Sequence, residues 1–196
     1  MLKNTQVQKQ IILAKALELV ATFGWSDDII GRTATKMGYD ENHLRLIFIN
    51  GTNELIDMYF NSIDDAMMIE LSNIDTSGLG VSAKIRLALK TRIRILNNYR
   101  DVTAKTISFL GLPWNAAFGL KLGWRSMDRI WSEFIQDSSV DFNYYTKRAL
   151  LYAAYATSVQ FFLGDYSSDL SETDDFIDRR IENVLGLGKF IAKFKS

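Results

Sequence analysis

The feature that most constrains the fold of this 196-residue chain is a helical periodicity that only one proline, Pro113, interrupts. Apolar residues recur every three to four positions along almost the whole sequence, the spacing that places them on one face of a helix. Strand-like alternation of apolar and polar residues is hard to find. The pattern predicts an all-α protein of about nine helices.

The first fifty residues predict three helices with helix-turn-helix proportions. The second of these helices ends at Gly38, and Asp40 can cap a short third helix over 41–48. We therefore expect residues 1–50 to form a helix-turn-helix-like subdomain. Residues 51–196 are expected to form a larger helical domain.

Glycine and proline positions shape one helix of the larger domain. Pro113 fits the first turn of a seventh helix that runs to about Ile135. Gly119 and Gly123 lie inside it, and each costs about 1 kcal/mol relative to alanine. They indicate a kink, a close approach of the backbone to something bulky, or two short helices in place of one. An eighth helix is expected over about 142–163, and a ninth follows it.

Composition narrows the chemistry that the chain can perform. The sequence has no cysteine, which excludes thiolate nucleophiles, zinc–thiolate sites and iron–sulfur clusters. Its single histidine, His43, excludes any site that needs two. The acidic pairs Asp64-Asp65 and Asp174-Asp175 are interpreted as solvated helix faces, and no Glu-x-x-His motif exists for a di-iron bundle. We predict no catalytic site, no metal site and no cofactor, and hence a protein that binds.

The charges of the helix-turn-helix region disfavour DNA reading. The candidate reading helix offers Arg45 but also Asp40 and Glu41. Residues 1–57 carry six Lys or Arg against seven Asp or Glu. Because non-specific DNA affinity depends mainly on phosphate neutralisation, we expect this subdomain to pack without reading DNA.

Large and small apolar side chains alternate in the second half of the chain. Three of the four tryptophans lie within 114–131, and further aromatic residues follow in the eighth helix. Aromatic residues separated by Gly and Ala can line a tunnel for a long apolar ligand, or they can form an ordinary core. The residues expected to line such a lipid site are Leu89, Ile93, Leu110, Trp114, Phe118, Leu122, Met127, Tyr152, Tyr155 and Phe162.

The C-terminal segment combines an apolar stripe with flanking lysines. This pattern is typical of an interfacial membrane helix, and equally of a basic helix end that packs on the core. The candidate membrane-contact residues are Leu187, Lys189, Phe190, Ile191, Lys193 and Phe194.

A series of short motifs occurs in a fixed order along the sequence. They are Ala16-Leu-Glu with Gly24-Trp25, Phe48 with Gly51 and Glu54-Leu55, Thr91-Arg-Ile-Arg-Ile-Leu96, Leu112-Pro113, and Asp141-Phe-Asn-Tyr-Tyr-Thr-Lys-Arg-Ala149. In this order the chain resembles the ubiquinone (coenzyme Q) biosynthesis accessory proteins, the ninth member of the coenzyme Q series. The resemblance extends from about Ala14 to the C-terminus.

The resemblance implies the fold of TetR-type repressors and a homodimer that binds isoprenoid lipids, including ubiquinone intermediates, or phospholipid. It implies presentation of the lipid to a membrane-associated partner, the di-iron demethoxyubiquinone hydroxylase. Tyr144 stands where a tryptophan is frequent and Lys147 where an arginine is frequent, which puts the affinity for the hydroxylase in question. The implied hydroxylase-binding residues are Ile130, Trp131, Asp141, Tyr144, Tyr145 and Arg148.

The N-terminal ten residues show neither a secretory nor a transit pattern. The chain therefore looks like a bacterial member, cytoplasmic and peripheral at the inner membrane. If it is instead a trimmed eukaryotic member, it is expected on the matrix side of the mitochondrial inner membrane. The alternative function is a TetR-type transcriptional regulator with an apolar effector.

Overall fold

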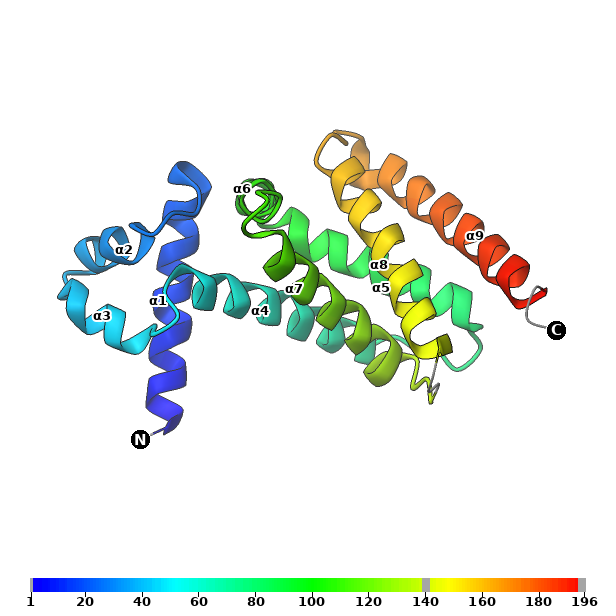
Figure 1. Ribbon diagram of the computed structural model, residues 1–196, viewed down its shortest axis with the longest axis horizontal. Helices are drawn as coiled ribbons and strands as arrows, with labels where there is room; N and C mark the ends of the chain where they lie inside the picture. Colours follow the sequence, from blue (N-terminus) through cyan, green and yellow to red (C-terminus); the bar gives the residue numbers. More distant parts are fainter. Residues whose placement is uncertain (1, 139–141, 194–196) are drawn as a thin grey trace. The chain divides into compact units, whose positions relative to one another are not determined.

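The computed structural model describes the backbone of residues 2–138 and 142–193, and the side chains of residues 5–138 and 143–184. Over these residues the chain is all-helical, as predicted, with nine α-helices and no strand (Figure 1). None of the described helices combines the length and the apolarity needed to cross a bilayer. The elements are α1 (Leu2–Phe23), α2 (Ile29–Met37), α3 (Glu41–Ile47), α4 (Thr52–Ser72), α5 (Val81–Asn97), α6 (Arg100–Leu110), α7 (Ala116–Arg129), the π-helix η1 (Ile130–Phe134), α8 (Phe142–Phe162), the 3₁₀-helix η2 (Ser168–Leu170) and α9 (Ser171–Lys193).

The helices pack as two compact units. The first unit comprises Met1–Ser62 and Tyr99–Gly119, and the second comprises Ile63–Asn98 and Leu120–Ser196. The boundary expected after residue 50 falls inside the first unit, because α4 and α6 contribute to the interior that the first three helices begin.

The turn between α2 and α3 is built as the sequence predicts. Gly38 ends α2 with a left-handed backbone, φ +70°, a conformation that glycine adopts without steric cost. Asp40 then caps α3, since its carboxylate accepts a hydrogen bond of 2.6 Å from the backbone N–H of Asn42 and one of 3.4 Å from that of His43. The two caps fix the start and the end of the turn.

Neutral hydrogen bonds connect the helices of the first unit. The indole N–H of Trp25, just after α1, donates to the hydroxyl of Thr106 in α6 at 2.8 Å. The hydroxyls of Tyr59 in α4 and Thr103 in α6 lie 3.0 Å apart. All four side chains are buried, so each polar atom needs its partner.

The predicted seventh helix is real but differs at both ends. Pro113 lies in a turn ahead of α7, which begins at Ala116, and the last turns widen into η1. The helix runs unbroken through Gly119 and Gly123, so the prediction of two short helices is wrong. At Gly123 an added Cβ would lie 2.2 Å from Cε2 of Tyr152, so the expected close approach is confirmed.

In the second unit α8 and α9 lie side by side, and α5 packs against both (Figure 1). The rings of Phe161 in α8 and Phe176 in α9 stack with centroids 4.4 Å apart. The α9 helix is capped from the preceding loop, where Asp165 accepts hydrogen bonds from the backbone N–H (2.9 Å) and the hydroxyl (2.5 Å) of Thr173. These contacts hold three helices around one apolar interior.

Candidate functional site

Seven of the ten residues expected to line a lipid site belong to the second unit. Six of the seven are buried and Tyr152 is half-buried. They come from α5, α7 and α8, and the close approach of Tyr152 to Gly123 packs α8 directly on α7. The structure therefore brings one apolar, aromatic-rich interior together from three helices. The seven are Leu89, Ile93, Leu122, Met127, Tyr152, Tyr155 and Phe162.

The other three expected residues belong to the first unit. Leu110 is buried, Phe118 is half-buried, and Trp114 is 76 % exposed. Two cavities lined by described residues, one beside η1 and one beside α2, contain none of the ten. A single lipid site containing all ten residues stays a prediction.

A buried ion pair crosses the second unit beside this interior. The guanidinium of Arg92 in α5 bonds to the carboxylate of Asp64 in α4, and the hydroxyl of Ser126 in α7 donates to Asp64 at 2.9 Å. Arg92 also donates to Ser126 at 3.1 Å. The prediction that Asp64 lies on a solvated face is wrong, because its carboxylate is fully buried as the partner of a buried arginine.

The electrostatics of this cluster favour the charged form of Arg92. Burial, the largest single influence, lowers the pKa of Arg92, but the charge and hydrogen bond of Asp64 together with those of Tyr155 outweigh it, and the pKa is raised overall. The ring of Tyr155 lies 5.2 Å from the guanidinium carbon, at cation–π distance. The cluster is a matched pair that fixes α4, α5 and α7 to one another and leaves no net charge in the interior.

The other acidic pair of the sequence is only partly solvated. Asp174 on α9 lies 2.5 Å from Arg94 on α5, and its side chain is 24 % exposed. Asp178, one turn further along α9, lies 2.9 Å from Lys90. The prediction of a solvated face is therefore right for Asp175, which is exposed, but incomplete for Asp174, whose carboxylate joins α9 to α5.

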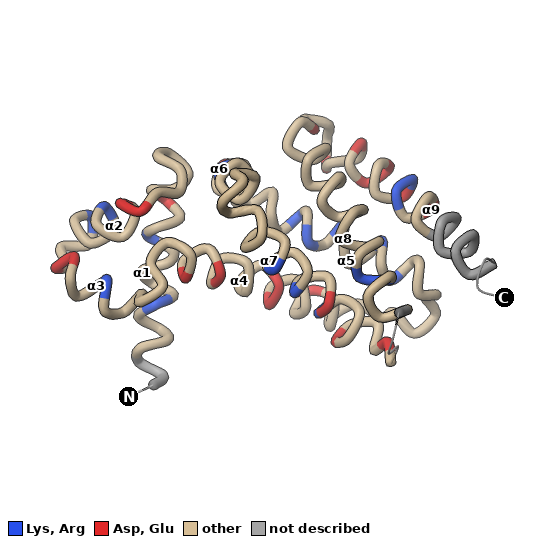
Figure 2. The backbone as a smooth tube through the Cα atoms, in the orientation of Figure 1, with Lys and Arg blue, Asp and Glu red and all other residues tan. Residues whose placement is uncertain are grey.

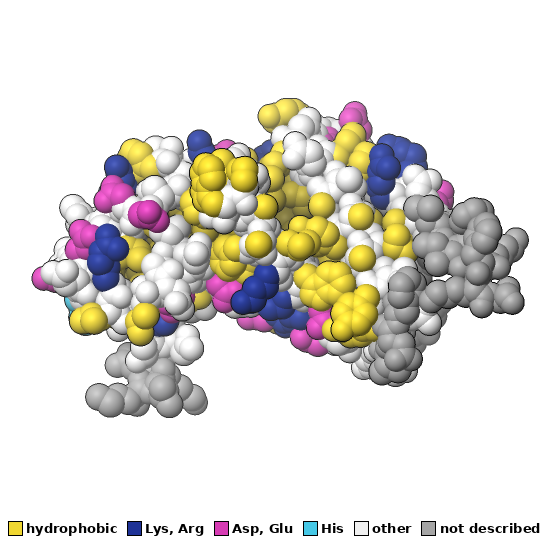
Figure 3. Space-filling view, in the orientation of Figure 1, with side chains coloured by type: hydrophobic (Ala, Val, Ile, Leu, Met, Phe, Trp, Pro, Cys, Tyr) yellow, Lys and Arg dark blue, Asp and Glu magenta, His cyan; other side chains and the backbone are white. Residues whose placement is uncertain are grey.

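An aromatic surface lies where α8 crosses α7. Tyr145 is 62 % exposed, and its ring centroid is 5.1 Å from that of Tyr144 and 6.3 Å from that of Trp124. Figure 3 shows hydrophobic side chains gathered over α7 and the start of α8. Exposed aromatic residues of this kind are enriched at sites of protein contact.

The buried side chain of Arg148 supports this surface. Its side chain is almost fully buried, its Nε lies 2.5 Å from Oδ1 of Asp128 on α7, and its guanidinium carbon lies 3.4 Å from the centroid of the Tyr144 ring. The hydroxyl of Tyr144 donates to the same Asp128 oxygen at 3.0 Å, and this bond raises the pKa of Tyr144. The sequence analysis missed Asp128. The only signal that could have found it is that a buried arginine such as Arg148 needs a carboxylate partner.

Two further residues of the implied hydroxylase patch are buried. Ile130 is fully buried and Trp131 is 7 % exposed, both in η1. The indole N–H of Trp131 is buried and has no hydrogen-bond acceptor among the described residues. The ammonium of Lys147 lies 5.3 Å from the Trp131 ring and 2.7 Å from Asp137. Among the described residues of the patch, Tyr145 is therefore the most accessible.

The remaining predicted residues lie outside the described ones. Asp141 of the hydroxylase patch has no described position. The backbone of α9 continues to Lys193, but the side chains of the candidate membrane-contact residues are not described. These residues are Leu187, Lys189, Phe190, Ile191, Lys193 and Phe194.

The fold places the chain in a structural class. The crystal structure of the TetR transcriptional regulator from Nitrosomonas europaea ATCC 19718 superposes with a TM-score of 0.72, covering 91 % of this chain and 98 % of that one. The two sequences are 20 % identical, so this similarity shows the fold alone. The predicted TetR-like fold is confirmed.

Sequence comparison gives the family. Residues 116–188 match the COQ9 family. The ubiquinone biosynthesis protein COQ9-B, mitochondrial, of Xenopus laevis is 30 % identical over 97 % of this chain and 67 % of its own length. The probable ubiquinone biosynthesis protein coq9, mitochondrial, of Dictyostelium discoideum is 29 % identical over 91 % of this chain, and the human COQ9 protein is 28 % identical over 97 %. This chain belongs to the COQ9 family.

The chain is shorter than these relatives. It spans 60 % of the Dictyostelium protein and 61 % of the human protein. The resemblance that the motif series predicts is confirmed over nearly the whole of this chain.

Proposed function

We propose that this chain acts in ubiquinone biosynthesis as an accessory protein that binds an isoprenoid or quinone-type lipid and catalyses no step itself. The observation that carries the proposal is membership of the COQ9 family, whose relatives are named as ubiquinone biosynthesis proteins. Supplying the chain to cells that lack their own COQ9 tests the role. Restored ubiquinone is expected, and unchanged ubiquinone would contradict it.

The apolar interior of the second unit supports the lipid part of the proposal. Its aromatic and aliphatic side chains come from three helices, and the charge next to them is neutralised by the pairing of Arg92 with Asp64. Binding sites for apolar ligands combine such a lining with a small number of polar groups. The lipid is expected to enter between α5, α7 and α8.

We further propose that the aromatic surface of α7 and α8 binds the di-iron demethoxyubiquinone hydroxylase. Tyr145 offers the exposed aromatic ring, and the contacts among Arg148, Asp128 and Tyr144 hold the ring beneath it in one orientation. Buried anchors under an exposed aromatic are typical of the centre of a binding surface.

The change Tyr145→Ala tests this surface. It removes the exposed ring while leaving the buried Arg148–Asp128 contact in place, and a loss of about 2 kcal/mol of binding is expected for a central aromatic. The measurement is capture of the purified hydroxylase by the variant. Tyr166→Ala is the matched control, since Tyr166 is 88 % exposed and lies beyond the end of α8. Equal capture by both variants would remove the assignment.

The proposed working location is a membrane surface. The relatives are named as mitochondrial proteins. In a eukaryote this proposal places the chain on the matrix side of the inner membrane, and in a bacterium on the cytoplasmic side, with the end of α9 against the lipid. A homodimer is proposed on the same family basis.

DNA binding by a TetR-like regulator is the competing interpretation of the fold. On α3 the guanidinium of Arg45 bonds to Glu41 at 2.7–2.8 Å, within the same helix. Leu46 is 76 % exposed and Ile49 is 84 % exposed. Apolar side chains therefore occupy much of the surface with which a DNA-binding helix would contact DNA. Figure 2 shows acidic and basic positions mixed over α2 and α3. These features favour the accessory role over DNA reading.

A further inference from the structure

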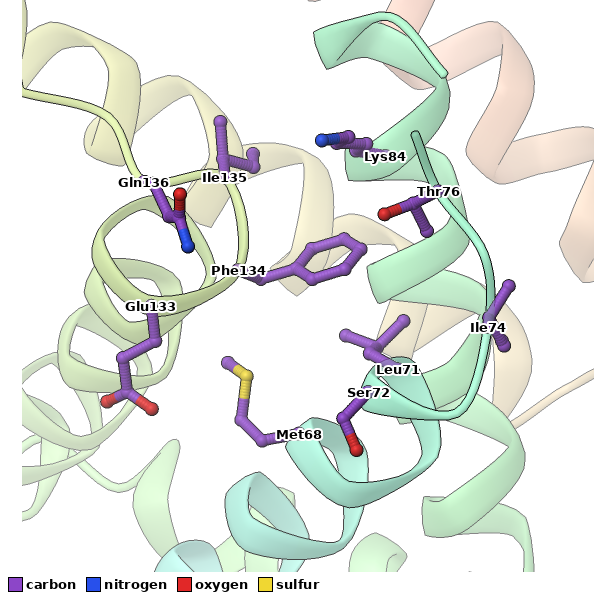
Figure 4. A pocket seen from close by; sticks show the side chains of 10 residues that line it. All are labelled: Met68, Leu71, Ser72, Ile74, Thr76, Lys84, Glu133, Phe134, Ile135 and Gln136. Atoms are coloured by element: carbon purple, nitrogen blue, oxygen red, sulfur yellow. The ribbon is translucent and has the colours of Figure 1, made fainter. Parts of the chain in front are cut away.

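A cavity of about 420 Å³ opens in the second unit between the end of α4, the loop before α5, and η1 (Figure 4). Its volume lies within the range of small-molecule sites, about 300–1,000 Å³. It shares no residue with the ten expected for the isoprenoid lipid. The lining residues are Met68, Leu71, Ser72, Ile74, Thr76, Lys84, Glu133, Phe134, Ile135 and Gln136.

One side of this cavity is apolar. Met68 and Leu71 extend from α4, and the ring of Phe134 points into the cavity from η1 (Figure 4). The widened turn of the π-helix gives Phe134 this direction, because the N–H of Ile135 bonds to the carbonyl of Ile130, five residues back, at 3.0 Å. Such π-turns recur at functional sites.

The residue that ends the π-turn has an unusual backbone. Gln136 has φ +59°, in the left-handed region that glutamine rarely adopts. A non-glycine residue is held there only where its surroundings over-determine the conformation. Gln136 is itself part of the lining, so the wall that carries Phe134 is fixed by local geometry.

Lys84, on the first turns of α5, brings a positive charge to this cavity. Its side chain is half-buried, and its ammonium points into the space between the loop and η1 (Figure 4). Within the described residues Lys84 makes no ion pair and no side-chain hydrogen bond. The acidic residue of the lining, Glu133, is bonded to Arg129 at 2.9 Å and 3.1 Å and points away from the Phe134 ring. Among the described residues, no acidic side chain therefore pairs with this cation at the edge of the apolar wall.

From this arrangement we propose that the cavity binds a single-chain amphiphile with a carboxylate head, such as a fatty acid. The chain lies against Met68, Leu71 and Phe134. The carboxylate accepts from the ammonium of Lys84 and from the hydroxyl of Thr76, which faces the same space (Figure 4). A charge-assisted bond gives the pocket its preference for an acid over an alcohol of equal length.

Calorimetric titration of the delipidated full chain with decanoate and with decanol tests the proposal. Decanoate is expected to bind at one site and about tenfold more tightly than decanol. In Lys84→Met decanoate should weaken about tenfold while decanol is unchanged. Phe134→Ala should weaken both ligands, and Lys121→Met, which removes an exposed cation of α7, should weaken neither.

Three results would overturn the pocket. They are the absence of saturable decanoate binding, equal affinity for acid and alcohol, and an unchanged decanoate affinity in Lys84→Met. A second possible source of the anion is the headgroup of an anionic lipid in a bilayer. Vesicles with and without phosphatidylglycerol test for it. Sedimentation with anionic vesicles that disappears in Lys84→Met would assign this lysine to a bilayer headgroup and contradict the pocket. Because the two lipid sites share no residue, Lys84→Met should leave any co-purified isoprenoid unchanged.

Discussion

The two units of this chain place different polar groups in their interiors. In the described part of the first unit every buried polar residue is a threonine, namely Thr33, Thr52, Thr103 and Thr106. In the described part of the second unit the buried polar residues include four charged ones, namely Asp64, Arg92, Arg148 and Asp165. A buried threonine can satisfy its hydroxyl within its own helix, whereas a buried charge needs a partner on another element.

The difference lies in the kind of bond that joins the elements of each unit. In the first unit Thr33 bonds within α2, to the carbonyl of Ile29 at 2.7 Å. The bonds of Thr106 and Thr103 to side chains outside α6 are neutral. Arg92 and Arg148 each bond to a carboxylate on another helix. Such pairs add little net stability, but they hold helices in one register. The proposed binding surfaces of the chain all lie in the second unit, the unit with the buried charge pairs.

The largest expected effect comes from breaking the buried pair. Asp64→Ala leaves the charge of Arg92 inside the second unit without its carboxylate, which should lower the free energy of unfolding by about 3–5 kcal/mol. The neighbouring Asp65→Ala is the matched control, since Asp65 is 64 % exposed in its pair with Arg129 and should cost less than about 1 kcal/mol. Urea unfolding measures both. Equal costs would show that Asp64 is not buried as an ion pair.

The close approach of α7 and α8 gives the next effect. In Gly123→Ala the added methyl meets the Tyr152 ring, and the required shift should cost about 1–3 kcal/mol. Tyr152→Ala should relieve most of that cost in the double variant. Gly78→Ala serves as control, because a Cβ there meets nothing within 4 Å. Additive costs for Gly123→Ala and Tyr152→Ala in a double-mutant cycle would contradict the contact.

The neutral contacts of the first unit predict a smaller change. Thr106→Val keeps the shape of the side chain but removes the acceptor for the Trp25 indole, at a cost of about 1 kcal/mol. Thermal unfolding, with tryptophan fluorescence as the local probe, measures the loss. A cost as large as that of Asp64→Ala would end the contrast between the two units.

The smallest effect is confined to acid. Burial raises the pKa of Asp165, but hydrogen bonds from Ser167 and Thr173 outweigh it and hold the pKa at about 2. Since this lies below the value of an unfolded aspartate, about 3.9, the carboxylate stabilises the fold above about pH 4 and this contribution is lost as pH falls to about 2. Asp165→Asn should therefore be less stable than the parent at pH 5 and approach it at pH 2. A constant difference in urea midpoint would refute this.

Much of the fold could be predicted from the sequence because helix signals are local. Periodicity indicates nine helices, Asp40 and Gly38 mark the turn between α2 and α3, and Gly123 indicates a close neighbour. The motif series identifies the family, because each motif is a short run of neighbouring residues. Each of these signals is carried by residues within a few turns of one another.

The elements that sequence could not supply depend on distant partners. Asp64 and Arg92 are 28 residues apart, so nothing near Asp64 distinguishes it from the solvated Asp65. The π-turn that orients Phe134 is not marked by any characteristic residue pattern in the sequence. The grouping of Lys84 with Phe134 arises only when three separate segments meet.

The most direct test of the proposed function is the lipid that the protein carries. The full chain would be purified without added lipid and extracted, and the extract compared by mass spectrometry with the membranes of the host. We predict a prenyl-chain quinone or precursor at near one molecule per chain, strongly enriched over its share of host lipid. Prenyl lipid at no more than the host proportion would contradict the account.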